Sequence, residues 1–252
     1  MIELLNVSLN LDGKQILDNV SLKIKKGDIG VVLGPSGAGK SSILKMILGL
    51  WKPDSGCVVI DGVDICGLKE KELLKIRRKM GIVFQGNALF DSLTVRQNIG
   101  YFLYEQNEME SKEIADLIEE VLTFINMPGI QRMYPDQLSG GMKKRVAIAR
   151  AMIYQPEIVL YDEPSAGLDP INGKQILDLI KKVRDKGSTS VVVTHIMNDA
   201  VSIGDQLTLV NNGIIVENGS VHDILNSKKE FVKDFFYEIF QDIELLKKEQ
   251  LV

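Results

Sequence analysis

The sequence predicts an α/β protein in which a mainly parallel sheet is covered by helices. Three observations support this class. A short apolar strand leads directly into a glycine-rich loop and then a helix, over residues 29–50. A long stretch with helical periodicity follows at 93–153, and strands alternate with helices again from residue 158. Such alternation is typical of parallel sheets, because parallel strands need long crossover connections that usually contain a helix.

The composition is that of an ordinary globular chain and excludes several classes of function. The 252 residues are 45% hydrophobic and 25% charged, and the net charge of −4 gives no electrostatic footprint for nucleic acid. The first ten residues do not resemble a secretion signal, and no apolar run approaches the roughly 18 residues of a membrane span. Cys57 and Cys66 lack metal-site or disulfide-framework spacing. We therefore expect a cytoplasmic chain without a nucleic-acid partner.

The first third of the chain predicts short strands, then a helix. Glycine turns at Asp12-Gly13 and Lys26-Gly27 separate the strands, and the last strand runs into the glycine-rich loop. The helix carries apolar residues on one face and ends before Pro53. The predicted elements are the strands Ile2–Leu9, Val20–Ile24 and Ile29–Leu33 and the helix Ser41–Leu50.

Helical periodicity dominates residues 93–153 and predicts a separate helical lobe. It is clearest between residues 114 and 125, where apolar residues recur every three or four positions. Beyond this lobe the pattern returns to strands and helices and closes with a hairpin around Asn211-Asn212-Gly213. The predicted elements are strand Ile158–Tyr161, helix Gly173–Val183, strand Ser190–Thr194, and hairpin strands Leu207–Val210 and Ile214–Val216.

The glycine-rich loop matches the phosphate-binding pattern GxxxxGK[ST]. Glycines let backbone N–H groups close around phosphates, and the following helix N-terminus adds positive potential. The lysine reaches the terminal phosphates and the serine can ligate Mg²⁺. The pattern arises by chance in about 1% of chains this long, and its place between a strand and a helix makes a simple turn a weak alternative. The stretch is Gly34, Pro35, Ser36, Gly37, Ala38, Gly39, Lys40 and Ser41.

Two acidic residues end the apolar strand that begins at Ile158. Asp162, at the carboxyl end of the strand, is placed to hold the Mg²⁺ shell, and Glu163 could polarise a water molecule as a general base. Taken alone, the pair could also be a solvated acidic loop. The phosphate-binding loop in the same chain favours the catalytic interpretation.

A second anion site is predicted where Ser139, Gly140 and Gly141 open another helix. One nucleotide does not need two helix N-termini from separate lobes, so we expect this site to act across a dimer. With these residues, the chain resembles the nucleotide-binding subunit of ATP-binding-cassette transporters from about Ile2 to about Leu225. Leu138–Met142 is similar to the signature motif of that family, usually LSGGQ.

The resemblance implies one cassette over 1–252 with a P-loop NTPase (RecA-like) core, an N-terminal antiparallel β subdomain and an inserted α-helical subdomain. The core and β subdomain would cover about 1–85 and 157–230, the helical subdomain about 86–156, and an amphipathic tail about 231–252. ATP and Mg²⁺ are the implied ligands.

The same resemblance implies roles for individual residues. Glu163, His195, Gln85 and Lys40 would be catalytic, with His195 contacting the γ-phosphate and Gln85 sensing Mg²⁺ and the attacking water. Taken alone, His195 would more often be a packed or solvated residue, and Gln85 would be interpreted as a solvated one. Ser165–Asp169 resembles the loop that crosses the dimer interface. Mg²⁺ would bind Ser41, Gln85 and Asp162, and the nucleotide would bind Gly34, Pro35, Ser36, Gly37, Ala38, Gly39, Lys40, Ser41, Ser42, Leu11, Ser139, Gly140 and Gly141.

Two positions depart from the family pattern. Met142 replaces the signature glutamine but leaves Ser139 and the two glycines, so activity should survive. Leu11 stands where the family commonly places an aromatic residue against adenine, and an aliphatic side chain covers a base without stacking. We therefore expect loose selectivity between purine bases.

The resemblance also implies partners. Two copies would sandwich ATP head to tail as a homodimer, beneath separate membrane permease subunits. Residues 83–95 and the LSGGM signature are similar to the Mla/Mce-type phospholipid transporters of the bacterial inner membrane. That likeness implies a peripheral position on its cytoplasmic side, an Mce-domain protein and a small regulatory subunit. A small-solute importer and a cassette protein outside transport remain alternatives.

An apolar stripe in the tail includes Phe231, Val232, Phe235 and Phe236 and continues through Ile239, Phe240 and Ile243. It must be buried somewhere. Packing on its own cassette, docking on the neighbouring subunit and membrane contact are the three interpretations.

Overall fold

The protein is described by a computed structural model over residues 1–106 and 109–237, and the chain divides into two units. The first unit comprises 1–68 and 191–252, and the second comprises 69–190. Each contains both strands and helices, which confirms the predicted α/β class. The sequence-predicted boundary of the helical subdomain, about 86–156, lies inside the second unit and stays a prediction.

An antiparallel sheet of four strands, in the order β2-β1-β4-β5, forms one part of the first unit. Alternating side chains of β1 and β2, such as Leu4 and Leu22, are buried, as expected for a sheet with one face on the core. The two predicted strands, Ile2–Leu9 and Val20–Ile24, are confirmed as β1 and β2, and both are longer than predicted. The strands β4 and β5 were not predicted. The bounds are β1 Ile2–Leu11, β2 Lys14–Ile24, β4 Ser55–Ile60 and β5 Val63–Asp64.

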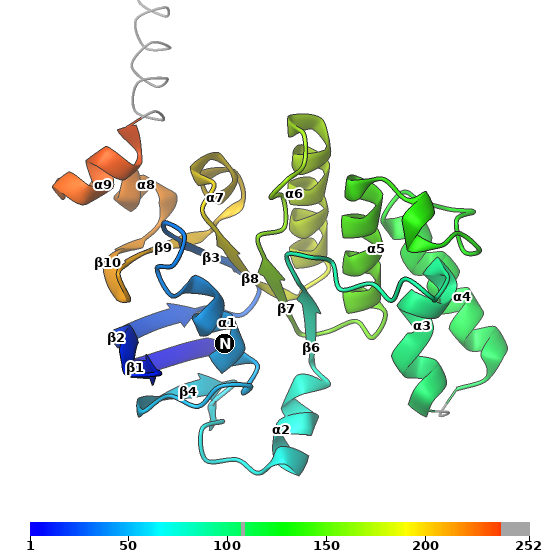
Figure 1. Ribbon diagram of the computed structural model, residues 1–252, viewed down its shortest axis with the longest axis horizontal. Helices are drawn as coiled ribbons and strands as arrows, with labels where there is room; N and C mark the ends of the chain where they lie inside the picture. Colours follow the sequence, from blue (N-terminus) through cyan, green and yellow to red (C-terminus); the bar gives the residue numbers. More distant parts are fainter. Residues whose placement is uncertain (107–108, 238–252) are drawn as a thin grey trace, which may run out of the picture. The chain divides into compact units, whose positions relative to one another are not determined.

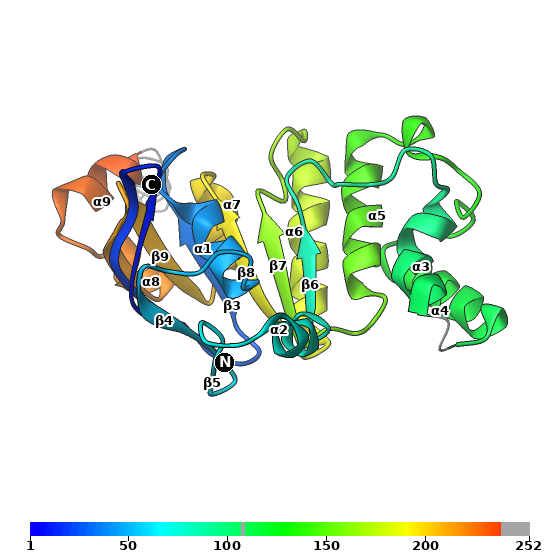
Figure 2. The same cartoon turned by 60° about the horizontal axis from the view of Figure 1, so that its bottom comes forward.

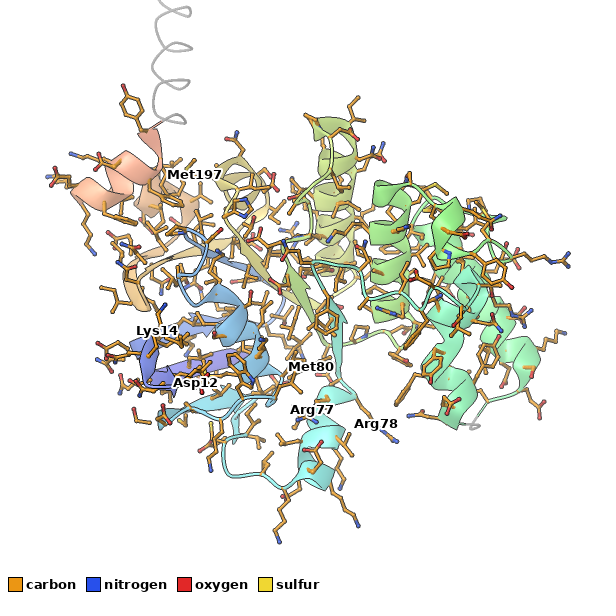
Figure 3. The ribbon with its side chains drawn as sticks, viewed as in Figure 1. Asp12, Lys14, Arg77, Arg78, Met80 and Met197 are labelled. Atoms are coloured by element: carbon orange, nitrogen blue, oxygen red, sulfur yellow. The ribbon has the colours of Figure 1, made fainter. Side chains whose placement is uncertain are left out.

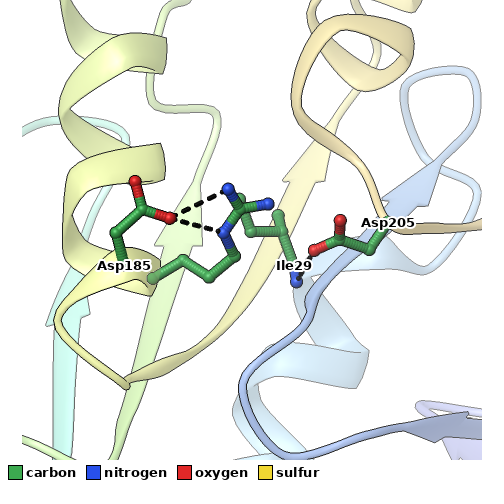
Figure 4. Close-up of polar contacts among 4 residues, drawn as sticks. Ile29, Asp185 and Asp205 are labelled. Carbon is green, nitrogen blue, oxygen red and sulfur yellow. Dashed lines mark hydrogen bonds and ion pairs between the residues drawn. The ribbon is translucent and has the colours of Figure 1, made fainter.

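The first unit also holds the strand that feeds the phosphate-binding loop. β3, Ile29–Leu33, is buried at every residue and pairs in parallel with β9, Gln206–Asn211. β9 forms the predicted hairpin with β10, Ile214–Gly219, and β8, Thr189–Thr194, follows β3 in the strand order. The Oδ2 atom of Asp205 accepts the N–H of Ile29 at 2.8 Å, which fixes the start of β3 (Figure 4).

Among residues 1–68 and 191–237 of the first unit, four helices accompany these strands. Helix α1 begins at Lys40, one residue before the predicted start, and lies beside the antiparallel sheet in both ribbon views (Figures 1 and 2). Val232 and Phe236 of the predicted apolar stripe are fully buried, in agreement with packing on its own cassette. Ile239, Phe240 and Ile243 lie outside the described residues. The bounds are α1 Lys40–Ile47, α7 Met197–Ile203, α8 Val221–Leu225 and α9 Glu230–Phe235.

The second unit combines two parallel strands with helices. β6, Met80–Val83, pairs in parallel with β7, Ile158–Asp162, so the predicted strand at Ile158 is confirmed with one more residue. Figure 4 shows a surface ion pair of this unit, between Arg184 and Asp185 at the end of α6. The helices are α2 Glu70–Arg77, α3 Val95–Gln106, α4 Ser111–Phe124, α5 Gly140–Met152 and α6 Pro170–Asp185, with a short 3₁₀ turn at Pro135–Gln137.

The helices predicted between residues 93 and 153 are confirmed, and α5 is their structural centre. It packs against α3, α4 and α6 and against β6 (Figures 1 and 2). Its second half buries a continuous apolar run from Val146 to Ala149. α4 buries Ile114, Ile118 and Leu122, the face predicted from its periodicity. Within the described 1–106 and 109–237, no helix has the length and apolar character needed to cross a bilayer.

Candidate functional site

The glycine-rich loop of the first unit has a backbone that only glycine can adopt at two positions. Gly37 and Gly39 have φ angles of 80° and 101°, in the left-handed region that side chains disfavour. A Cβ at Gly34 would lie 2.1 Å from the carbonyl oxygen of Val210, and one at Gly39 would lie 2.6 Å from Cδ2 of Leu17. At Gly34 and Gly39 the loop therefore lies closely against β9 and β2, with no room for a side chain at those two positions.

Lys40 and Ser41 follow this loop at the first turn of α1. Lys40 is only 6% exposed, and its Nζ donates to the carbonyl oxygens of Gly34 and Pro35 at 2.8 and 3.0 Å. The first turn of α1 carries no acidic residue and no side-chain cap, so no carboxylate of that turn opposes the positive end of the helix dipole. The ammonium of Lys40, the hydroxyl of Ser41 and the glycine-rich loop together fit a nucleoside triphosphate with its Mg²⁺.

Two further predicted residues, Leu11 and His195, belong to the same unit. Leu11 is the last residue of β1 and is half-buried beside the turn between Asp12 and Lys14 (Figure 3). His195 is exposed directly after β8, the strand next to β3, and α7 begins two residues later at Met197. His195 thus follows β8, and β8 lies beside β3, the strand that leads into the phosphate-binding loop.

In the second unit, β7 ends at Asp162, and the next residue, Glu163, has a left-handed backbone conformation. Glu163 is 8% exposed and has a φ of 48°. The left-handed region costs a residue with a side chain roughly 1–2 kcal/mol, so surrounding contacts must fix it. The carbonyl oxygen of Glu163 accepts the N–H of Ala166 at 3.3 Å and the ammonium of Lys144 at 3.3 Å. These bonds hold the predicted general base in place.

Gln85 follows the end of β6 by two residues and its side chain is exposed. Its carbonyl oxygen accepts a hydrogen bond of 2.6 Å from the same Lys144 ammonium, which is also 3.5 Å from the carbonyl oxygen of Phe84. Burial lowers the pKa of Lys144, while the carboxylates of Asp162 and Glu163 act in the opposite direction. One ammonium therefore connects the predicted water-sensing glutamine to the predicted base.

Sequence reasoning did not identify Lys144. It lies in the run Lys143-Lys144-Arg145, where charged residues are usually solvated, yet it is 3% exposed. Its spacing on α5 gave one usable signal, because Ala147 and Ile148, three and four residues later on the same helix face, are buried. Only the folded chain shows which carbonyl groups it reaches.

The predicted second anion site lies at the start of α5. Ser139 is the N-cap residue, and its Oγ accepts the N–H of Met142 at 3.3 Å. A Cβ at Gly141 would come within 2.8 Å of Oδ1 of Asn172, so glycine permits close contact with α6. Asn172 in turn bonds the carboxylate of Asp169, the N-cap of α6, and these hydrogen bonds lower the Asp169 pKa. The signature residues and the predicted dimer-crossing loop thus form one connected structure.

The comparisons with known proteins agree with these motifs. The family described as ABC transporter matches residues 17–166. A methionine import ATP-binding protein, MetN of Carboxydothermus hydrogenoformans, is 43% identical over 93% of this chain and 71% of its own. Arabidopsis thaliana TRIGALACTOSYLDIACYLGLYCEROL 3, chloroplastic, is 40% identical over 93% of this chain and 73% of its own.

A third relative is the intermembrane phospholipid transport ATP-binding protein MlaF of Haemophilus influenzae, 34% identical over 93% of this chain and 89% of its own. Among solved structures, a dimeric ATP-binding cassette in a post-hydrolysis state with ADP and Pi matches with a TM-score of 0.80 and 36% identity, over 88% of this chain and 99% of that one. The chain therefore belongs to the ABC transporter family. It is an ATP-hydrolysing cassette with the P-loop NTPase fold, and its relatives serve more than one substrate.

Proposed function

We propose that this chain is the ATP-hydrolysing subunit of a transporter that moves phospholipid between bacterial membranes through separate permease subunits. The observation that carries the proposal is the MlaF relative, which is matched over 89% of its length and is named for phospholipid transport. The Arabidopsis relative is named after a galactolipid, which supports a lipid substrate but not a phospholipid in particular. The MetN relative, at 43% identity, supports the second candidate, an importer for a small solute.

In the first unit, the proposed role of the glycine-rich loop is to bind the nucleotide phosphates. Its backbone supplies N–H donors, Lys40 supplies a positive charge to the terminal phosphates, and Ser41 supplies a hydroxyl to the metal. Lys40 already donates two hydrogen bonds to loop carbonyl groups, so its ammonium is held at the loop before any phosphate competes for it. Leu11 would cover the base, and His195 would contact the γ-phosphate.

In the second unit, Glu163 is proposed to accept a proton from the attacking water. Mg²⁺ would neutralise phosphate charge, and Asp162, Gln85 and Ser41 are the residues proposed to hold it. The φ of 48° at Glu163 takes the chain out of the extended conformation of β7 directly after Asp162. Asp162 and Glu163 can thus serve separate roles despite being adjacent.

The proposed active form is a homodimer in which the start of α5 from one copy faces the nucleotide of the other. The solved dimeric cassette with ADP and Pi supports this arrangement for a chain of the same family. Ser139, Gly140 and Gly141 would then supply the anion site at the helix N-terminus. Their connection to Asn172 and Asp169 would carry the signature and the adjacent loop together during closure of the dimer.

A groove of the second unit is proposed to receive the permease. A hollow of about 940 Å³ lies beside α2 and combines basic side chains with apolar and aromatic ones. Figure 3 labels Arg77, Arg78 and Met80 where α2 gives way to β6. A second hollow of about 430 Å³ continues around Phe84 and Phe90 near Gln85. The larger one is lined by Lys71, Leu74, Lys75, Arg77, Arg78, Met80, Phe102, Glu105, Gln106 and Tyr154.

This groove favours a permease segment with acidic and apolar side chains, because four of its lining residues are basic and only Glu105 is acidic. Docking there would place the chain peripherally at the cytoplasmic face of the inner membrane. An Mce-domain protein and a small regulatory subunit complete the proposed assembly. We propose these two partners because residues 83–95 and the LSGGM signature resemble the Mla/Mce-type phospholipid transporters.

The experiment that tests this function is purification of the tagged protein from its native membranes in mild detergent, followed by mass spectrometry of proteins and lipids. A permease, an Mce-domain protein and bound phospholipid are the expected partners. A permease with a solute-binding protein would support the importer instead. Ribosomes, or no membrane partner, would contradict both transport functions.

A further inference from the structure

A single buried cation in the second unit contacts two segments that are far apart in the sequence. Lys144, in the second turn of α5, is 3% exposed. Its Nζ donates to the carbonyl oxygens of Gln85 at 2.6 Å and Glu163 at 3.3 Å, across sequence separations of 59 and 19 residues. With the carbonyl oxygen of Phe84 at 3.5 Å, the three donors of the ammonium have three acceptors.

These carbonyl groups belong to segments that regular structure does not hold. The paired register of β6 and β7 ends at Val83 and Tyr161, so the carbonyl groups of Gln85 and Glu163 lie beyond it. Glu163 also adopts the left-handed conformation, which persists only where surrounding contacts impose it. An ammonium bonded to both carbonyl groups restrains both segments at once, and charge-assisted hydrogen bonds are stronger than neutral ones.

Helix α5 carries a second cation, Arg150, that restrains only one of these two segments. Arg150 donates to the carbonyl oxygens of Ala88 at 2.7 Å and Asn87 at 2.9 Å, the two left-handed residues that follow Gln85. Among the described residues, the hydrogen bonds of Arg150 go to this loop and not to Glu163 or its neighbours. Arg150 thus fixes only the loop after β6, whereas Lys144 fixes that loop and the end of β7.

We propose that Lys144 is a positioning residue that sets the spacing between Gln85 and Glu163 and ties both to the helix that begins with the signature motif. It contacts backbone carbonyl groups and no reacting atom. This proposal rests on the proposed roles of Gln85 and Glu163 in ATP hydrolysis. Helix α5 begins at Gly140, with Ser139 as its N-cap. A displacement of α5 would therefore be transmitted through Lys144 to Gln85 and Glu163 together.

The consequence is specific to the chemical step. Nucleotide phosphates are bound, in the proposed function, by residues 34–42 of the first unit, whereas the carbonyl groups that Lys144 bonds belong to the second unit. Loss of Lys144 donors would therefore lower kcat and leave nucleotide affinity nearly unchanged. A general loss of folding would lower both.

The test compares Lys144→Met, Lys144→Arg and Arg150→Met in the full chain. Methionine keeps an unbranched side chain, one atom shorter, and removes the donors, whereas arginine keeps the charge and the donors. Steady-state ATP hydrolysis gives kcat, and equilibrium binding of a fluorescent ATP analogue gives Kd. We expect Lys144→Met to lower kcat at least tenfold with Kd within about twofold, and Lys144→Arg to recover part of the rate. A wild-type kcat in Lys144→Met would overturn the proposal.

Backbone hydrogen exchange measured by mass spectrometry supplies a readout that does not depend on catalysis. The N–H of Asn87 bonds the Phe84 carbonyl and that of Ala166 bonds the Glu163 carbonyl, so each reports one segment. Lys144→Met should speed exchange at both, and Arg150→Met only at the first. If Lys144→Met speeds exchange at only one segment, or at neither, Lys144 does not restrain both segments and the proposal is rejected. This holds even if the wild type hydrolyses no ATP. An inactive wild type would count against the proposed function alone.

Discussion

The side chain of Asn172 occupies the space that a β-carbon on Gly141 would need. Such a Cβ would lie 2.8 Å from Oδ1 of Asn172 and 3.0 Å from its Cγ. Asn172 is restrained because its Nδ2 donates to the carboxylate of Asp169 at the start of α6. The second signature glycine is therefore required by a contact within its own unit as well as by any role in binding nucleotide.

The first prediction concerns Gly141→Ala. The added methyl group must displace Asn172 and its bond to Asp169, and overpacking of this kind typically costs about 1–3 kcal/mol in the free energy of unfolding. Urea denaturation measures this change. Gly140→Ala is the matched steric control, because its Cβ would meet only Leu168 at 3.5 Å. Equal destabilisation by the two substitutions would show that the Asn172 contact is unimportant.

The second prediction concerns Glu163→Gln. Glutamine keeps the shape of the side chain but cannot accept a proton at neutral pH, so ATP hydrolysis should fall by roughly 10²- to 10⁴-fold. Nucleotide binding should persist, because the proposed phosphate ligands are residues 34–42. Phosphate release and binding of a fluorescent ATP analogue measure the two quantities. Full hydrolysis by the variant would remove Glu163 as the general base.

The third prediction concerns base selectivity. Leu11 ends β1 half-buried and offers an aliphatic surface, whereas a stacked aromatic ring adds about 0.5–1.5 kcal/mol to a ring contact. We expect ATP and GTP to be hydrolysed with similar kcat/KM, and Leu11→Tyr to tighten the binding of both nucleotides. Parallel assays with the two nucleotides measure this. Strict preference of the wild type for ATP would contradict the assignment of Leu11.

The fourth prediction concerns the permease groove. Leu74 and Phe102 are 50% and 42% exposed on its wall, so charged replacements should leave the melting temperature of the isolated chain nearly unchanged. Leu74→Glu and Phe102→Glu should reduce recovery of the permease with the tagged protein, since they add negative charge to a surface proposed to face acidic residues. Leu50→Glu, at an exposed leucine of the first unit, is a control. Undiminished recovery would place the permease elsewhere.

The local patterns of the sequence predicted the phosphate-binding loop and the strands around it because each depends on neighbouring residues. The glycine positions, the buried strand β3 and the start of α1 follow directly from residues 29–47. The pattern at 55–77 predicted neither β4 nor α2. Helix α2 buries no residue and is rich in charge, so it carries no apolar stripe to reveal it.

The roles of Lys144 and Arg150 could not be predicted for a different reason. Their partners are backbone carbonyl groups of residues 59 to 63 positions earlier and, for Lys144, also of Glu163, 19 positions later; a carbonyl group leaves no mark in the sequence. The left-handed conformation of Glu163 is likewise imposed by tertiary contacts rather than by its residue type. The strand pattern predicted Glu163, and the family resemblance supplied Gln85 and His195. The fold shows the ammonium that connects Gln85 to Glu163.

The central claim is that ATP hydrolysis by this chain drives phospholipid movement. The most direct test reconstitutes the purified complex of the chain with its native membrane partners in vesicles and follows transfer of fluorescent phospholipid to acceptor vesicles. The account predicts transfer that requires ATP and Mg²⁺ and stops when the complex carries Glu163→Gln. ATP hydrolysis without ATP-dependent lipid transfer, together with accumulation of a small solute such as methionine, would contradict it.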